Sequence, residues 1–241
     1  WVIGISIPFP TEASALAFVI AARESAVLAP RCLEFLDAGA LDIARTSVQD
    51  PGWATSAQAL IYTELAGSEA DEPPLDAWLE LAMAHAALDD DIRVYDGEAA
   101  LRDARKLRHA VPATMHERAA PYRATGGRRI STDWAVPYRR LADALAASRR
   151  AVERRGLAQP VTFGHAGNGH PHQNFIARDS AELERITDAV GETLRDVIAL
   201  GGTVAAEHGI GKIKSRWLPM QMSGTQRAMM RAIKHELDPH N

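Results

Sequence analysis

The feature that most constrains this chain is the stretch VTFGHAGNGHPHQNF, residues 161–175. It begins as an apolar, β-branched strand and then turns polar around its glycines and histidines. His165 and His172 have an odd spacing, which places two side chains on opposite faces of a regular strand. They converge only if the backbone between them bends, and Gly167 and Gly169 tolerate the positive φ that a bend requires. The stretch therefore predicts a strand that folds back and brings two imidazoles together.

A second polar stretch offers the remaining ligand. GGTVAAEHGIGK, residues 201–212, places Glu207 and His208 on a turn flanked by glycines. Two imidazoles and a carboxylate with open coordination positions are typical of a catalytic divalent metal, whereas structural zinc normally uses several cysteines. The chain has a single cysteine, Cys32. The sequence thus favours a catalytic site for zinc or a related divalent metal.

Composition excludes some function classes. The formal net charge is -4 and 46% of the residues are hydrophobic, so the chain has material for a sizeable core and no basic surface typical of nucleic-acid binding. No apolar run is long enough to cross a bilayer. The chain starts without a methionine and stops abruptly after LDPHN, and we expect it to be part of a longer polypeptide.

Strand-like and helix-like segments alternate along the chain with short linkers, which predicts one α+β unit over residues 1–241, with helices packed mainly on one face of a sheet. Pro112 is expected to end or kink the helix that contains the preceding residues. Strands are expected at residues 1–7, 57–65 and 91–96 and around 161–175, a short apolar element at 31–37, and helices at 11–26, 75–88, 98–111, 138–156, 180–202 and 225–237.

The motifs GHAGNGHPHQN and GGTVAAEHGIGK resemble the two signature motifs in the C-terminal domain of FAD-linked oxidases. This is the family of D-lactate dehydrogenase, the glycolate oxidase flavoprotein subunit and D-2-hydroxyglutarate dehydrogenase. PFPTEASA, LEFLD, STDWAVP and KHELDPHN also agree with the family pattern, so the resemblance covers essentially the whole chain. It implies a large antiparallel sheet with helices on one side, related to the ferredoxin-like arrangement, that forms a cap over a flavin.

The resemblance also implies a reaction. Family members oxidise a D-2-hydroxy acid to the 2-oxo acid, with FAD accepting the hydride and a histidine accepting the hydroxyl proton. On the matching positions, His165, His172 and Glu207 would bind a divalent metal, which we expect to be zinc, with manganese or iron as alternatives. His208 would be the general base.

Substrate contacts are implied as well. Asn174 matches the last Asn of the first motif, a substrate contact. Arg108 is the best match for the family arginine that binds the substrate carboxylate, although the tryptophan that accompanies it in the family is missing. Lys212 and Lys214 are alternatives for that role.

The chain departs from the family pattern at two motif positions. Asn168 stands where the motif has Asp, and His170 where it has Asn. These changes remove a negative charge and add a further imidazole. His170 could therefore replace His172 as a metal ligand, retune the metal, or mark a subfamily.

The FAD-binding domain of the family is absent from this chain. We expect FAD to be held by a domain in cis or by a partner subunit, and the isolated chain to be inactive. Other expected partners are the small 2-hydroxy-acid substrate, an electron acceptor and a second copy of the chain. The expected location is the cytoplasm, with peripheral association at a membrane as an option.

Two other functions remain open at this point. One is a metal-dependent hydrolase or lyase that uses the same histidines and glutamate without flavin. The other is a non-catalytic binding module derived from the cap domain.

Overall fold

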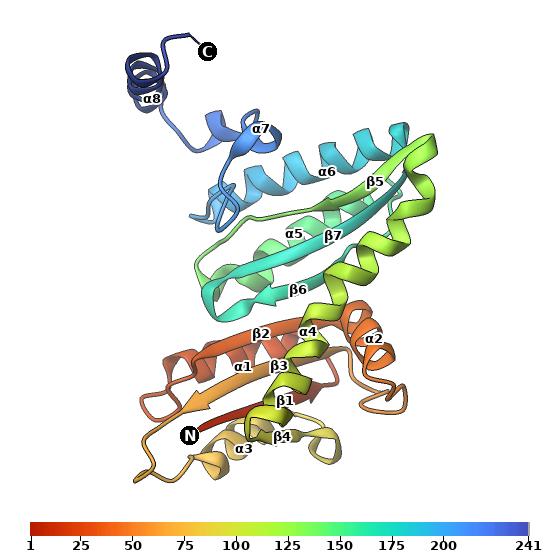
Figure 1. The fold of residues 1–241 in the computed structure, drawn as a ribbon, viewed down its shortest axis with the longest axis vertical. Coiled ribbons are helices and arrows are strands. Elements are labelled where there is room, and N and C mark those ends of the chain that lie inside the picture. The colour runs from red at the N-terminus through yellow and green to blue at the C-terminus, as the bar shows by residue number, and fades with distance from the viewer. Residues whose placement is uncertain (241) are drawn as a thin grey trace.

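The computed structural model describes residues 1–240, and their strands form one seven-stranded antiparallel sheet (Figure 1). The strand order is β4-β1-β3-β2-β6-β7-β5. This confirms the α+β class and the large antiparallel sheet. The strands are β1 Val2–Phe9, β2 Cys32–Asp37, β3 Ala59–Ala66, β4 Arg93–Asp96, β5 Gly126–Ser131, β6 Val161–His165 and β7 His170–Asp179.

Helices cover both faces of the sheet, with more of them on one face. Helices α1, α3, α5 and α6 contribute to the larger hydrophobic core, whereas α2 and α4 contribute to a second core on the opposite face. The helices are α1 Glu12–Glu24, α2 Ala38–Ser47, α3 Leu75–Ala84, α4 Glu98–Ala119, α5 Leu141–Glu153, α6 Ser180–Ala199, α7 Gly211–Lys214 and α8 Gly224–Leu237.

The sheet consists of two halves that meet edge to edge. Strands β1 to β4 have the order β4-β1-β3-β2, with helices as the crossovers, which is the ferredoxin-like arrangement. Strands β5 to β7 repeat three strands of the same pattern, in the order β6-β7-β5. The halves join where β2 pairs with β6, with Glu34 opposite His165. In Figure 1, α4 runs across the front of both halves.

Helix α4 differs from the sequence expectation. It does not end at Pro112 but continues to Ala119. Leu107, Val111 and Met115 are all buried at helical spacing in the core beneath α4, so the apolar stripe continues past the proline. Burial of this stripe offsets the backbone hydrogen bond that proline cannot donate.

The C-terminal part of the chain lies apart from the sheet. Helix α8 projects away from the rest of the molecule in Figure 1, and its apolar residues Met229, Met230, Ile233 and Leu237 are exposed. Within residues 1–240, no helix combines the length and the apolar character needed to cross a membrane.

Asp37 links the end of β2 to two neighbouring elements. Its Oδ1 accepts a hydrogen bond of 2.8 Å from the backbone N–H of Ala40, which caps the N-terminus of α2. Its Oδ2 accepts a hydrogen bond of 2.6 Å from the backbone N–H of Thr162 in β6. The side chain is therefore a buried connection between the halves of the sheet.

We expect Asp37→Ala to lower the free energy of unfolding by about 2–3 kcal/mol, because it removes a helix cap and leaves the buried N–H of Thr162 without a partner. Thr11 caps α1 through the N–H of Ser14 at an exposed position. The matched variant Thr11→Ala should lose only about 1 kcal/mol. Chemical denaturation of both variants checks this, and equal losses would contradict the linking role of Asp37.

Candidate metal centre

The three histidines of the first motif lie on one hairpin. Strands β6 and β7 pair directly, with His165 opposite His170 and Phe163 opposite His172. Side chains that face each other across a strand pair, or that lie two residues apart on one strand, point to the same face. The hairpin therefore brings His165, His170 and His172 together on the face of the sheet that α4 covers. The strand folds back as expected from the sequence, so that His165 and His172 lie on the same face.

Glycines allow this hairpin, but not in the way the sequence suggested. Gly169 has a φ of 69° and ends the turn in the left-handed region, as expected. Gly164, within β6, also has a positive φ, of 133°. Gly167 has no positive φ, so the expectation for it was wrong. Its role is close approach, since a Cβ there would lie 3.1 Å from the Cβ of Leu33.

Asp133 positions the loop that carries Glu207 and His208. Its buried carboxylate accepts hydrogen bonds of 3.3, 3.1 and 3.1 Å from the backbone N–H groups of Ala206, Glu207 and His208. The ammonium of Lys214 also donates to it. Burial alone would raise the pKa of Asp133, but Lys214 and these N–H groups outweigh burial and lower the pKa to about 2.

The predicted ligands converge. His165, His172 and Glu207, together with His170, each offer one donor atom, and these four atoms all lie within 4.8 Å of one another. Oε1 of Glu207 lies 3.5 Å from Nε2 of His165 and 3.7 Å from Nδ1 of His170. Imidazole and carboxylate donors at this spacing match the chemistry of a divalent-metal site.

A second group of donors overlaps the first. One atom each from Asp133, His172 and His208 also lie within 4.8 Å of one another. However, the carboxylate of Asp133 already accepts three backbone N–H groups and pairs with Lys214. Asp133 is therefore better suited to anchor the loop than to bind an ion.

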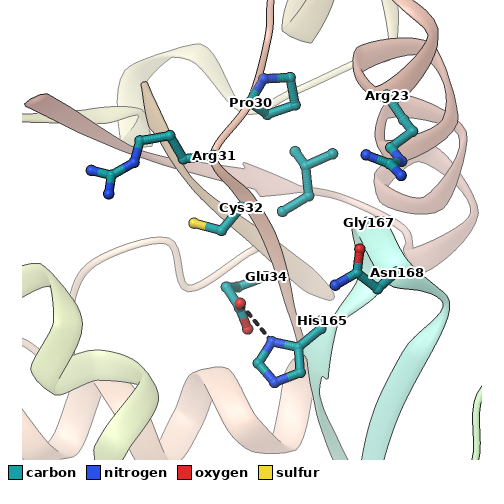
Figure 2. Close-up of a pocket in the computed structure, with 9 residues that line it drawn as sticks. Arg23, Pro30, Arg31, Cys32, Glu34, His165, Gly167 and Asn168 are labelled. Atoms are coloured by element: carbon teal, nitrogen blue, oxygen red, sulfur yellow. Dashed lines mark hydrogen bonds and ion pairs between the residues drawn. The ribbon is translucent and has the colours of Figure 1, made fainter. Parts of the chain in front are cut away.

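The outer nitrogens of two histidines contact protein acceptors. Nδ1 of His165 is 2.8 Å from Oε1 of Glu34, as the dashed line in Figure 2 shows, and this contact raises the pKa of His165. Nδ1 of His172 faces the carbonyl oxygen of Thr132 at 3.5 Å. Such outer contacts fix ring orientation in metal-binding histidines.

Burial has the opposite effect on the other imidazoles. It lowers the pKa of His172 to about 4, with the nearby His170 adding to the shift. Burial also lowers the pKa of His170. Both rings are thus held neutral, which is the form that binds metal.

The predicted substrate residues differ in their placement. A guanidinium nitrogen of Arg108, on α4, lies 3.3 Å from Oε1 of Glu34, so Arg108 stands beside the cluster. Asn174 follows His172 on the same face of β7 but lines a different cavity, below Met115 and Arg118 of α4. Its amide is buried and has no hydrogen-bond partner among the described residues.

The alternative lysines are also placed differently. Lys214 is paired with Asp133, and its ammonium also donates to the carbonyl oxygen of Gly209. It holds the loop that carries Glu207. Lys212 is exposed on α7.

Sequence reasoning missed two carboxylates of this centre, Glu34 and Asp133. Both are almost fully buried, at 3% and 2% exposure. The available signal was an acidic residue next to apolar ones: Glu34 stands between Leu and Phe in CLEFLD, and Asp133 directly precedes Trp-Ala-Val in STDWAVP. Acidic residues are rarely buried without a partner, so such positions indicate a functional or structural contact.

A cavity of about 220 Å³ adjoins the cluster. Figure 2 shows His165 and Glu34 on one side of it, with Arg31, Arg23 and Asn168 around the rest. The wall is polar and carries two cationic side chains. Such a cavity suits a small anionic molecule.

Comparison with known proteins identifies related chains. The family model for FAD linked oxidases, C-terminal domain, matches residues 3–241. D-2-hydroxyglutarate dehydrogenase of Xanthomonas citri pv. viticola is 31% identical over 75% of this chain and 37% of its own length. The glycolate oxidase subunit GlcD of Escherichia coli (strain K12) is 26% identical over 87% of this chain and 40% of its own length. The chain thus spans well under half the length of these relatives.

Solved structures support the fold. P-cresol methylhydroxylase with substrate bound matches with a TM-score of 0.59 and 13% identity, covering 100% of this chain and 51% of that one. Alkyldihydroxyacetonephosphate synthase matches with a TM-score of 0.55 and 14% identity, covering 99% of this chain and 43% of that one. At these identities the likeness concerns the fold alone.

We expect Asp133→Asn to loosen the loop that carries Glu207, because the neutral amide is a weaker acceptor and no longer pairs with Lys214. Hydrogen exchange at the amides of Glu207 and His208 should become about tenfold faster or more, whereas the amide of Ala206 also donates to the backbone carbonyl of Asp133 and should change less. Asp143→Asn is the control, since Asp143, in the first turn of α5, forms only an exposed ion pair with Arg140, the residue before the helix. Unchanged exchange in Asp133→Asn would contradict the anchoring role.

The metal-free chain should lose stability in acid. The pKa of His172 is about 4 in the folded chain and near 6.5 in the unfolded chain, so the unfolded state binds more protons between these values. The contribution is present above pH 6.5 and is lost as the pH falls through 4, by about 2–3 kcal/mol. His165 has a raised pKa, so its contribution to stability is lost only as the pH rises above 6.5, outside this acid range.

Denaturation in the presence of a chelator, at pH 7 and at pH 4, measures this loss. His172→Gln should reduce it, whereas His235→Gln, at an exposed position on α8, should not. The same acid sensitivity in all three proteins would contradict the assignment to His172.

Proposed function

The chain belongs to the family of the C-terminal domain of FAD-linked oxidases, and we propose that it is the substrate- and metal-binding part of a flavoenzyme that oxidises a D-2-hydroxy acid to the 2-oxo acid. The observation that carries this proposal is the convergence of His165, His172 and Glu207, with His208 beside them. The names of the relatives, a glycolate oxidase subunit and a D-2-hydroxyglutarate dehydrogenase, support a small 2-hydroxy acid as the substrate class.

The metal would be held by His165, His172 and Glu207. Their donor atoms fit a divalent ion in type and spacing, and zinc is the proposed metal, with manganese and iron as alternatives. A divalent ion there would lower the pKa of a bound substrate hydroxyl.

His208 would accept the hydroxyl proton. Its ring stacks on that of His172, with centroids 5.5 Å apart and planes 8° from parallel, so it lies directly beside a ligand. Its Nδ1 faces Oδ1 of Asp133 at 3.8 Å, which leaves Nε2 available for the substrate. The imidazole is also exposed, as a group that meets an incoming substrate must be.

Cationic side chains would orient the substrate carboxylate. Arg108 stands beside the cluster and is already held in place by Glu34. A guanidinium binds a carboxylate with two parallel hydrogen bonds, which fixes its orientation. Asn174 would contact the substrate only if the substrate reached the cavity below α4, because it does not line the cavity beside His165.

FAD, held by a further domain in cis or by a partner subunit, would accept the hydride from C2 of the substrate and pass the electrons to an acceptor. The exposed apolar residues of α8, Met229, Met230, Ile233 and Leu237, would contact that domain, since a patch of this kind is typical of a protein interface.

The test is turnover of the chain combined with its flavin-binding domain, with D-lactate, glycolate and D-2-hydroxyglutarate as substrates and a dye as electron acceptor. We expect at least one substrate to be oxidised, and His208→Gln to lower kcat by about 10²–10⁴-fold with its metal retained. His235→Gln, at an exposed site on α8, is the matched control and should keep full activity.

No oxidation of any 2-hydroxy acid by a folded, flavin-loaded protein would overturn the proposal. A full rate in His208→Gln would overturn the role of His208 alone. Hydrolysis or elimination without flavin would point instead to the metal-dependent hydrolase or lyase.

A further inference from the structure

His170 occupies a position in the centre that its place in the motif did not assign. It lies directly opposite His165 across the hairpin and is only 2% exposed. Its ring centroid is 4.5 Å from that of His172 and 5.5 Å from that of His165. Its Nδ1 is 3.7 Å from Oε1 of Glu207. His170 therefore joins the other three candidate ligands and does not replace any of them.

The second nitrogen of His170 has the kind of neighbour that a metal-binding histidine has. Nε2 lies 3.1 Å from Oδ1 of Asp133, although the geometry falls short of a well-formed hydrogen bond. This contact parallels those of His165 with Glu34 and of His172 with the carbonyl oxygen of Thr132. In each ring the outer nitrogen faces a protein acceptor, which leaves the other nitrogen for the centre of the cluster.

The burial of His170 is hard to explain without a ligand. Its close neighbours are two imidazoles and two carboxylates, with Asp133 beside Nε2 and Glu207 beside Nδ1. A buried polar ring that lacks full hydrogen bonding is unfavourable. If the proton of the neutral ring is on Nε2, toward Asp133, the lone pair of Nδ1 faces the carboxylate of Glu207 at 3.7 Å. A cation between Nδ1 and that carboxylate would turn this repulsion between two acceptors into two favourable contacts.

We propose that His170 is a fourth metal ligand, so that the centre is a site of three histidines and one glutamate that selects an imidazole-preferring ion over manganese or magnesium. This inference rests on the proposed function, because it assumes that His165, His172 and Glu207 bind a metal. Zinc, cobalt, nickel and ferrous iron favour imidazole, whereas manganese and magnesium favour oxygen donors. The third imidazole thus sets the choice of metal.

The first experiment measures the dissociation constants of the metal-free chain for zinc and for manganese by competition with a chelating indicator. His170→Asn places the amide of the family motif at this position. We expect it to weaken zinc binding about tenfold or more while changing manganese binding far less, so the preference for zinc falls. His235→Asn, on exposed α8, is the control and should match the unchanged chain.

A second measurement does not depend on a variant that folds. Long-range proton–nitrogen NMR spectra of the histidine rings, recorded with and without zinc, report which nitrogen binds the ion. Nδ1 of His170 should shift as a ligand nitrogen, together with one nitrogen each of His165 and His172. A third measurement returns to the variant: the visible spectrum of the cobalt-loaded chain should change in His170→Asn.

The outcomes separate the inference from the function on which it rests. If the folded chain binds no ion, both the metal role and the role of His170 are wrong. If His165→Ala abolishes zinc binding but His170→Asn leaves the zinc affinity, the zinc-to-manganese preference and the cobalt spectrum unchanged, only the role of His170 is wrong. Loss of zinc preference in His170→Asn, with a ligand shift at its Nδ1, supports the inference.

Discussion

The arrangement of the centre depends on one buried carboxylate, that of Asp133. The loop that carries Glu207 and His208 has no regular secondary structure of its own, and backbone N–H groups of three consecutive residues donate to this side chain. Lys214 balances the charge, which keeps the carboxylate ionised despite its burial. The same carboxylate approaches His170 on β7. One side chain therefore joins the hairpin and the loop, which supply all four candidate ligands.

The hairpin imposes a second constraint, because it places three imidazoles on one face, with ring centroids 4.5 to 5.5 Å apart. Such rings cannot all be protonated at that distance in a buried setting. The structure resolves this unevenly: His165 has the carboxylate of Glu34 as a partner, while burial keeps His170 and His172 neutral. Three neutral imidazoles can share one divalent ion, whereas three protonated imidazoles at this distance would repel one another.

Much of this could be predicted from the sequence, and the parts that could not share a physical cause. The fold class, most helices and the meeting of His165, His172 and Glu207 followed from local patterns and from the motifs. Helix α2 and the C-terminal end of α4 were not predicted. Packing against the rest of the chain, which buries Leu41 and Met115, stabilises these helical segments more than local propensity does. Glu34 and Asp133 were missed because their hydrogen-bond partners, His165 and the backbone of Glu207, lie more than 70 residues away in the sequence. No pattern within a short window reports such pairings.

The seam between the two halves of the sheet separates two kinds of residue. All the candidate ligands come from the second half and the loop after it, whereas Glu34, Arg31 and Arg23, which line the adjoining cavity, come from the first. Substitutions in the first half can therefore reshape the cavity without removing a ligand. If the proposed metal site is correct, this architecture lets the cavity wall change by point mutation in one half of the sheet while the candidate ligands stay in the other.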